Sequence, residues 1–259
     1  MSELLGKVAE GMYNDKPLRI FRGTYSAPMD DPYFRDGRFV GQEATINVEF
    51  AVHPNNSGRI IVNIPGSNGE IDGYGGKYKI LGRHIQSDGL GAVVRVGNHF
   101  SDGFLQDVNL RSVMRYVEEY AWEICGNPEP EILLMGFSAG ASAIAARAHE
   151  YPEVTRILLG APAKGMRGIS VRDGISRFRG EVYIMIGDKD DNVGTDSGQV
   201  FYDWALDASK KELFVLPDCD HQFRGERNGR IISEAPFYAF SLGEKPKFPD
   251  PAGGIKLYD

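Results

Sequence analysis

The sequence predicts an α/β fold with a mostly parallel, doubly wound sheet of about eight strands flanked by helices. Compact runs rich in Val, Ile and Leu recur from residue 59 onward, and each run ends in a turn-forming residue. Continuous apolarity of this kind is typical of parallel strands that are buried on both faces. Helical patterns lie between these runs, and alternating strands and helices require right-handed crossovers, which produce a doubly wound sheet.

Each element follows from the local pattern. Two half-exposed strands at residues 19–26 and 44–53 are expected to form an antiparallel lead-in. The buried strands are expected at the runs RIIVNIPG, GAVVRVGN, EILLMGFS, TRILLGAP, EVYIMIGD and KELFVLPD, which begin at residues 59, 91, 131, 155, 181 and 211. Helices are expected at residues 106–124, 139–150 and 199–208. Because ligands of such sheets bind beyond the carboxyl ends of the strands, chemistry is expected in the residues after each run.

The length of 259 residues suits a single domain that covers residues 1–259. Residues 1–17 read as an N-terminal extension, and residues 245–259, rich in Pro and Gly, read as a loosely attached tail. Residues 163–180, between two expected strands, are too few to form a large cap domain.

Composition and sequence patterns narrow the expected binding partners and the expected cellular compartment of the protein. The net charge of −7 argues against a nucleic-acid partner or an acidic membrane, because no basic patch would neutralise phosphates. No apolar run approaches the roughly 20 residues that span a bilayer, and the N-terminus lacks the apolar core of a signal peptide. The chain has two cysteines, Cys125 and Cys219, and two lone thiols are more often buried apolar residues in a reducing compartment than a disulfide, so we expect a cytoplasmic location.

The run that ends at Phe137 leads into Gly136-Phe137-Ser138-Ala139-Gly140, a G-x-S-x-G motif between a strand and an Ala-rich helix. A sharp strand-to-helix turn exposes such a serine above the sheet, and side chains at the glycine positions would collide with the backbone. The N-terminus of the following helix supports negative charge as it develops. Ser138 is therefore the predicted nucleophile.

From about residue 59 to residue 221, this combination resembles the α/β-hydrolase family. The resemblance implies an eight-stranded sheet and a catalytic triad in the order serine, acid, histidine. It identifies neither a subfamily nor a substrate.

The acid is expected after the strand EVYIMIG. In similar hydrolases it occupies a G-x-x-D-x-x-V pattern, which here runs from Gly187 to Val193 and selects Asp190. Asp188 and Asp191 are close rivals, since the register of a loop is hard to fix from sequence.

His221 follows the last buried strand, at the place where the general base of the family lies. An imidazole suits this role because its pKa lets it take the serine proton and return it, while a carboxylate orients the ring. Asp220 is a weaker orienting acid, because adjacent side chains diverge. His53 and His84 read as surface or turn residues, and His99 is a candidate for the mouth of the site.

The resemblance also implies an oxyanion hole made of two backbone N–H groups. One belongs to Ala139, the residue after the nucleophile. The other lies in the Gly-rich loop after RIIVNIP, where Ser67 is the best candidate and Asn68 the second. The family usually has His-Gly before this donor, and this chain has Pro65-Gly66 instead.

Together these residues predict a serine hydrolase that cleaves an ester or thioester of a small acyl substrate through an acyl-enzyme on Ser138. No metal or organic cofactor is needed. An acyltransferase or a peptidase would use the same residues, and a non-catalytic binding protein with this fold is the alternative of a different class.

Overall fold

The computed structural model describes the backbone of residues 7–13, 16–28, 33–35, 38–40, 45–244, 246–248 and 256–258. Much of the predicted N-terminal extension (residues 1–17) and of the predicted tail (residues 245–259) lies outside the described residues. The described parts include two strands, β1 (Lys7–Tyr13) and β12 (Lys256–Tyr258), which pair with the two edges of the main sheet.

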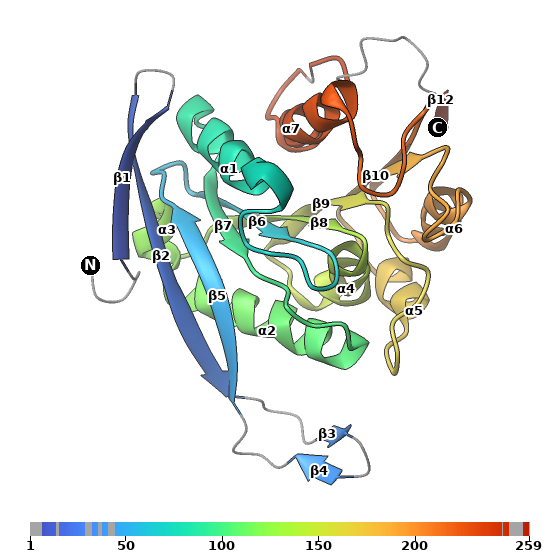
Figure 1. The fold of residues 1–259 in the computed structure, drawn as a ribbon, viewed down its shortest axis with the longest axis horizontal. Helices are drawn as coiled ribbons and strands as arrows, with labels where there is room; N and C mark the ends of the chain where they lie inside the picture. Colours follow the sequence, from blue (N-terminus) through green and yellow to red (C-terminus); the bar gives the residue numbers. More distant parts are fainter. Residues whose placement is uncertain are drawn as a thin grey trace.

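The centre of the molecule is a ten-stranded sheet in the order β1-β2-β5-β7-β6-β8-β9-β10-β11-β12 (Figure 1). Its inner strands are β2 (Lys16–Pro28), β5 (Thr45–His53), β6 (Arg59–Ile64), β7 (Ala92–Val96), β8 (Glu131–Phe137), β9 (Val154–Gly160), β10 (Glu181–Gly187) and β11 (Lys210–Leu216). These eight coincide with the eight strands that the sequence predicts. The six strands from β7 to β11 in this order are parallel, whereas β1, β2, β5 and β12 are antiparallel to their neighbours. The short strands β3 (Tyr33–Arg35) and β4 (Arg38–Val40) form a separate hairpin.

Helices cover both faces of the sheet, as a doubly wound topology requires. On one face lie α1 (Lys77–Asp88) and α7 (Glu226–Phe240), which contact each other, and Figure 1 shows them together at the top of the view. The other face carries α2 (Gly103–Glu119), α3 (Ala121–Cys125), α4 (Ala139–Arg147), α5 (Val171–Ser176) and α6 (Ser197–Trp204). The sequence predicted one helix over residues 106–124, and the structure instead interrupts it at Tyr120, between α2 and α3.

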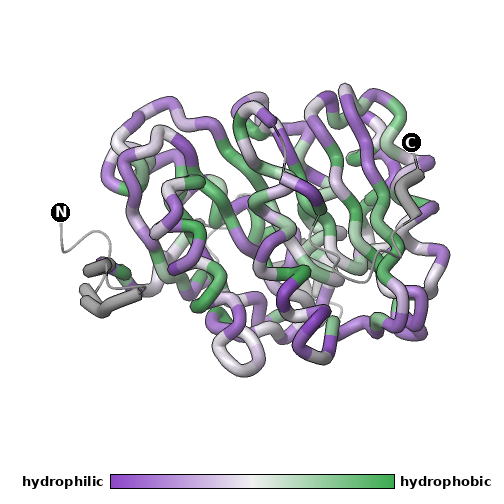
Figure 2. The backbone as a smooth tube through the Cα atoms, turned by 90° about the horizontal axis from the view of Figure 1, so that it is seen from above, coloured by the Kyte–Doolittle hydropathy of each residue, from purple (hydrophilic) through white to green (hydrophobic). Residues whose placement is uncertain are grey.

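The central strands are apolar because both of their faces are covered. Every residue of β6 and β7 is buried, including three polar residues, Arg59, Asn63 and Arg95. Figure 2 shows this pattern as hydrophobic stretches along the strands and hydrophilic segments on the loops around them. A polar side chain within such a strand requires a reason, and Arg95 has one at the candidate site described below.

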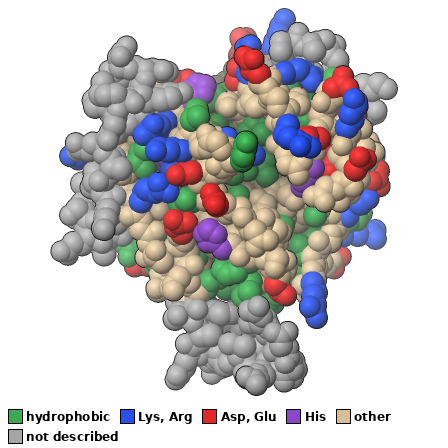
Figure 3. Space-filling model, viewed as in Figure 1, with side chains coloured by type: hydrophobic (Ala, Val, Ile, Leu, Met, Phe, Trp, Pro, Cys, Tyr) green, Lys and Arg blue, Asp and Glu red, His purple; other side chains and the backbone are tan. Residues whose placement is uncertain are grey.

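The connections leave the carboxyl ends of the parallel strands accessible. Between β9 and β10 the chain forms only the six-residue helix α5, so no large cap domain is built there. Figure 3 shows basic and acidic side chains interspersed on one face of the molecule, with hydrophobic side chains between them. None of the helices in the described ranges combines the length and the apolar character of a bilayer-spanning segment.

Candidate functional site

Ser138 lies at the sharp turn between β8 and α4. Its backbone has φ 52° and ψ −122°, a conformation that residues with side chains rarely adopt. The turn is held from both sides, because the Ser138 N–H donates to Gly160 O (2.8 Å) and the Ser138 carbonyl accepts from Ser142 N (3.1 Å). Neighbouring structure thus maintains a strained residue whose side chain stays half-exposed at the edge of the sheet.

The two glycines of the motif are required by close packing. A Cβ atom on Gly140 would lie 2.6 Å from the carbonyl oxygen of Ile64, at the end of β6. A Cβ atom on Gly136 would lie 2.8 Å from the amide nitrogen of Ala141, in the first turn of α4. Both distances are below contact range, so the motif fits this turn only with glycine at these positions.

The structure brings Ser138, His221 and Asp190 into one hydrogen-bonded row. The Nε2 atom of His221 lies 3.1 Å from Ser138 Oγ, and its Nδ1 atom lies 2.8 Å from Asp190 Oδ2. Asp190 is fully buried, and its second oxygen accepts N–H bonds from Asn192 and Val193 at 3.1 Å each. The loops after β8, β11 and β10 therefore place a hydroxyl, an imidazole and a carboxylate, respectively, in one hydrogen-bonded row.

The rival carboxylates lie elsewhere. Asp188 and Asp191 are exposed on either side of buried Asp190. Asp220 accepts from the backbone N–H and the guanidinium of Arg224, and these bonds, the backbone one first, lower the pKa of its carboxyl group. Of the four acids, Asp190 is the one that contacts the imidazole of His221.

A cavity of about 320 Å³ opens beside Ser138. It is lined by Ser67, Ser101, Gly103, Gln106, Ser138, Ala139, Ala163, Gly165, Met166, Arg167, Asn192 and Val193. His99, a candidate for the mouth of the site, is not in this lining; its Nε2 atom lies 3.2 Å from Glu49 Oε2 at the surface. The cavity therefore connects the loops after β6, β7, β8, β9 and β10 at the carboxyl edge of the sheet.

Comparison with known proteins identifies the fold. No family model matches the sequence, and no curated protein matches it. Among solved structures, an esterase from Pyrococcus furiosus is 13% identical, with 92% of this chain and 95% of that chain covered and a TM-score of 0.61. The esterase domain of a Rhodothermus marinus protein is 15% identical (82% and 96% covered, TM-score 0.56), and so is a dienelactone hydrolase from Anabaena variabilis (85% and 99% covered, TM-score 0.56). The chain has the α/β-hydrolase fold.

In this α/β-hydrolase fold, the loop after β6 approaches the serine closely. A Cβ atom on Gly66 would lie 3.0 Å from Ser138 Cβ and 3.6 Å from Ser138 Oγ. The next residue, Ser67, lines the same cavity as Ala139. Neither the Ser67 nor the Ala139 amide N–H has a backbone acceptor within the described ranges. The second candidate, Asn68, donates its N–H to Phe100 O (3.4 Å), so Ser67 is the candidate with a free donor.

A buried arginine holds this loop. Arg95 of β7 is fully buried and donates from Nη1 to Ile71 O (2.8 Å) and to Asp72 Oδ1 (2.6 Å). Its Nε donates to Nε2 of His53 (2.8 Å), so that imidazole nitrogen accepts and the ring is neutral. Burial, together with the charge of Arg95, lowers the pKa of His53 well below 6.5. The expectation that His53 is a surface residue is therefore wrong.

Two amide side chains support the same loop, and sequence reasoning did not single out either of them. Asn98 donates from Nδ2 to Pro65 O (3.0 Å), and its backbone exchanges two hydrogen bonds with Gly69. Gln106 donates to Ser67 Oγ (2.7 Å). The one available signal was Arg95, the charged residue in the otherwise apolar strand AVVRV.

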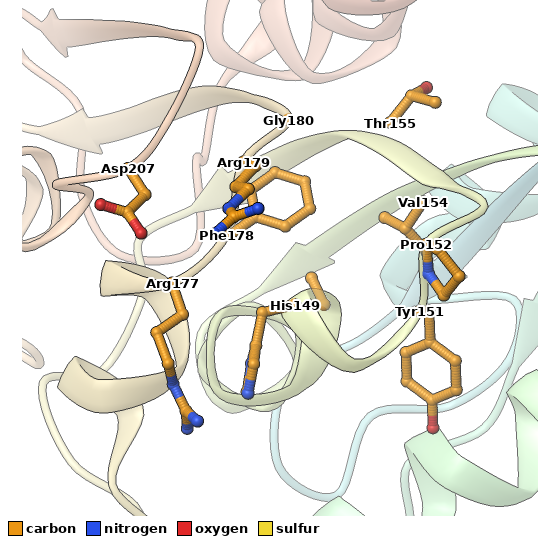
Figure 4. Close-up of a pocket in the computed structure, with 11 residues that line it drawn as sticks. His149, Tyr151, Pro152, Val154, Thr155, Arg177, Phe178, Arg179, Gly180 and Asp207 are labelled. Atoms are coloured by element: carbon orange, nitrogen blue, oxygen red, sulfur yellow. The ribbon is translucent and has the colours of Figure 1, made fainter.

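A larger cavity, of about 610 Å³, lies near the amino ends of β9 and β10 (Figure 4). It is lined by Ala148, His149, Tyr151, Pro152, Val154, Thr155, Arg177, Phe178, Arg179, Gly180 and Asp207. Figure 4 shows His149 and Arg177 extending alongside each other; burial of His149, followed by the charge of Arg177, lowers the pKa of the imidazole. Neither this cavity nor any other place within the described residues holds a group of His, Cys, Asp and Glu suited to a metal ion.

Proposed function

We propose that the chain is a serine hydrolase that cleaves an ester or thioester bond through an acyl-enzyme on Ser138. The observation that carries this proposal is the row of hydrogen bonds from Ser138 through His221 to Asp190 beside an open cavity. Similarity to esterase and dienelactone hydrolase structures supports the fold that such a site needs.

The geometry suits nucleophilic acyl transfer. Ser138 Oγ attacks the acyl carbon while His221 Nε2 takes its proton, and buried Asp190 holds the Nδ1–H tautomer and stabilises the imidazolium. His221 then gives the proton to the leaving alcohol or thiol. Water, deprotonated by the same imidazole, attacks the acyl-enzyme and releases the acid and Ser138.

The N–H groups of Ser67 and Ala139 would hold the oxyanion during both steps. Their unoccupied donors beside Ser138 support this role. One such donor contributes roughly 100-fold or more to the rate when it is fully oriented.

The same residues would also serve an acyltransferase or a peptidase. A cavity of about 320 Å³ without a large cap favours a small or accessible acyl group over a long lipid. The chemistry needs no metal or organic cofactor, and the net charge of −7 favours a small-molecule substrate over a nucleic acid. We further propose a cytoplasmic location, which the two buried, unpaired cysteines support.

The decisive experiment is labelling with a fluorophosphonate, read by intact mass, of wild type, Ser138→Ala and a control, Ser233→Ala, which changes a half-buried serine of α7. We expect a single adduct on wild type and on the control, and none on Ser138→Ala. A folded wild type that forms no adduct and hydrolyses no short ester or thioester would leave the non-catalytic binding protein as the better interpretation.

A further inference from the structure

The side chain of Gln106 fixes the hydrogen bonding of the Ser67 hydroxyl. Gln106 is 3% exposed, and its Nε2 atom lies 2.8 Å from Phe100 O and 2.7 Å from Ser67 Oγ. A carbonyl oxygen accepts only, so the atom that faces Phe100 must be the amide nitrogen. That nitrogen donates only, so Ser67 Oγ must accept, and its own hydrogen remains free.

The free hydrogen is well placed for catalysis. Ser67, Gln106, Ser138 and Ala139 line one cavity, and the residue before Ser67 is packed against the Ser138 side chain. Within the described residues, Ser67 Oγ makes one hydrogen bond, which it accepts from Gln106 Nε2. An acyl oxygen that accepts from the Ser67 N–H would lie within reach of the hydroxyl of the same residue.

We propose that the Ser67 hydroxyl is a third donor to the oxyanion, and that Gln106 is the positioning residue that aims it. This inference rests on the proposed function. The hydroxyl keeps its proton throughout and stabilises the negative oxygen by a hydrogen bond that strengthens as charge develops. The chain thus adds a side-chain donor to a loop that lacks the usual His-Gly sequence.

The test uses Ser67→Ala, which keeps the backbone N–H and removes only the hydroxyl. We expect kcat for a short 4-nitrophenyl ester to fall roughly 10–100-fold with KM within about twofold, and Ser67→Thr to restore much of it. An alkyl trifluoromethyl ketone, which forms a hemiketal with the serine and places an oxyanion in the hole, should bind more weakly by a similar factor. Ser233→Ala is the matched control.

Gln106→Glu tests the positioning role. A carboxylate accepts only, so the Ser67 hydroxyl would turn toward it and away from the site. We expect a kcat loss similar to that of Ser67→Ala, with no further loss in the double variant and with folding checked by thermal melting. An active Ser67→Ala variant with unchanged kcat and inhibitor affinity would overturn this inference and leave the proposed function standing. A wild type without labelling or hydrolysis would overturn the proposed function itself.

A different observation bears on the substrate. Among the residues that line the cavity beside Ser138, Arg167 carries the one formal charge. It is exposed, and the described part of the chain offers it no carboxylate. Lys164 of the same loop is instead neutralised by Asp196, at 2.8 Å.

The backbone of Arg167 is anchored at the cavity rim. The Ile169 N–H donates to Met166 O (3.2 Å), and Gly168 has φ 77°, so Arg167 lies within a tight turn. This turn packs against α2, because a Cβ atom on Gly103 would lie 2.9 Å from Arg167 N. An unpaired guanidinium on an anchored turn that lines the same cavity as Ser138 is suited to bind a carboxylate with two parallel hydrogen bonds.

We infer that the preferred acyl group carries a carboxylate, as in the monoester of a short dicarboxylic acid; this too rests on the proposed function. The test compares 4-nitrophenyl hydrogen glutarate with 4-nitrophenyl valerate, which match in chain length but differ in charge. We expect wild type to prefer the charged ester roughly tenfold in kcat/KM, and Arg167→Gln to lower that ratio toward one, mainly through KM.

Lys164→Gln is the control, and it should keep the preference of wild type. Equal ratios in wild type and Arg167→Gln would overturn the inference about the substrate while the hydrolase stands. Absence of hydrolysis of both esters by wild type, together with absence of labelling, would count against the proposed function instead.

Discussion

The cavity beside Ser138 has about half the volume of the cavity beside His149, 320 against 610 Å³, yet the two differ more in construction than in size. The smaller cavity lies where parallel strands end, and loops from five of them meet around it. The larger one lies where strands begin, and no hydroxyl or carboxylate of the described residues is hydrogen-bonded to Nδ1 of its imidazole. Volume does not distinguish the candidate site. Its position at the carboxyl edge of the sheet does, together with the hydrogen-bonded row of Ser138, His221 and Asp190.

The largest difference between the two regions is expected from removing His221, which contacts Ser138, or His149, which lines the larger cavity. We expect His221→Ala to lower kcat by roughly 10⁴-fold or more, because Ser138 loses its base. His149→Ala should leave kcat within about twofold. Steady-state hydrolysis of a short ester measures both, and a comparable loss in the two variants would show that the larger cavity takes part in the reaction.

The acid can be tested in the same way. Asp190→Asn should lower kcat by roughly 10³–10⁴-fold, because an amide stabilises the wrong tautomer of His221 and no imidazolium partner remains. Asp188→Asn, two residues away and exposed, should stay within a few-fold. If Asp188→Asn or Asp191→Asn were the more damaging change, the contact between Asp190 and His221 would not represent the working arrangement.

The sequence predicted the fold well because each central strand is buried on both faces and therefore carries its own apolar signal. The eight strands, the turn at Ser138 and the short connection between β9 and β10 follow from local patterns. The spacing from Gly187 to Val193 selected Asp190, which the structure places 2.8 Å from His221. The roles of these residues stay predictions.

The support of the loop after β6 was not predictable in this way, because it depends on pairing between distant strands. Arg95 of β7 lies opposite Ala51 of β5, a register that brings its side chain to His53. Neither residue signals the other along the chain. Gln106 likewise contacts Ser67 only after the loop after β6 has packed on α2.

Substitution of Arg95 compares the two regions by stability instead of activity. Arg95→Met would remove bonds to Ile71, Asp72 and His53 from a fully buried position. We expect the free energy of unfolding to fall by about 2–4 kcal/mol, measured by denaturant titration. Arg179→Met, an exposed change in the larger cavity, should cost less than about 0.5 kcal/mol. Equal losses would mean that Arg95 does not hold the loop.

The smallest expected effect is a pH dependence that comes from His53. Burial, followed by the charge of Arg95, keeps the folded-state pKa of this imidazole well below 6.5. A hydrogen bond to Gln86 raises the pKa, whereas the charges of Arg83 and Arg22 lower it further. Between that pKa and pH 6.5 the unfolded chain binds one more proton than the folded chain, so acid favours unfolding. The free energy of unfolding should therefore fall as the pH drops below 6.5, by up to about 1.4 kcal/mol per pH unit from this group.

His53→Gln keeps an acceptor for Arg95 and removes the titration. Subtracting its unfolding free energies from those of wild type, at several pH values between about 5 and 7.5, isolates the contribution of His53 from that of every carboxylate. His149→Gln is the comparison from the larger cavity, where the pKa is lowered too, but for a half-buried ring. If the two variants reduced the pH dependence of the unfolding free energy equally, the buried contact of His53 with Arg95 would oppose protonation no more than the surroundings of His149 do. A larger change in His53→Gln than in His149→Gln would show that burial against Arg95 opposes protonation of His53 more strongly than the larger cavity opposes protonation of His149.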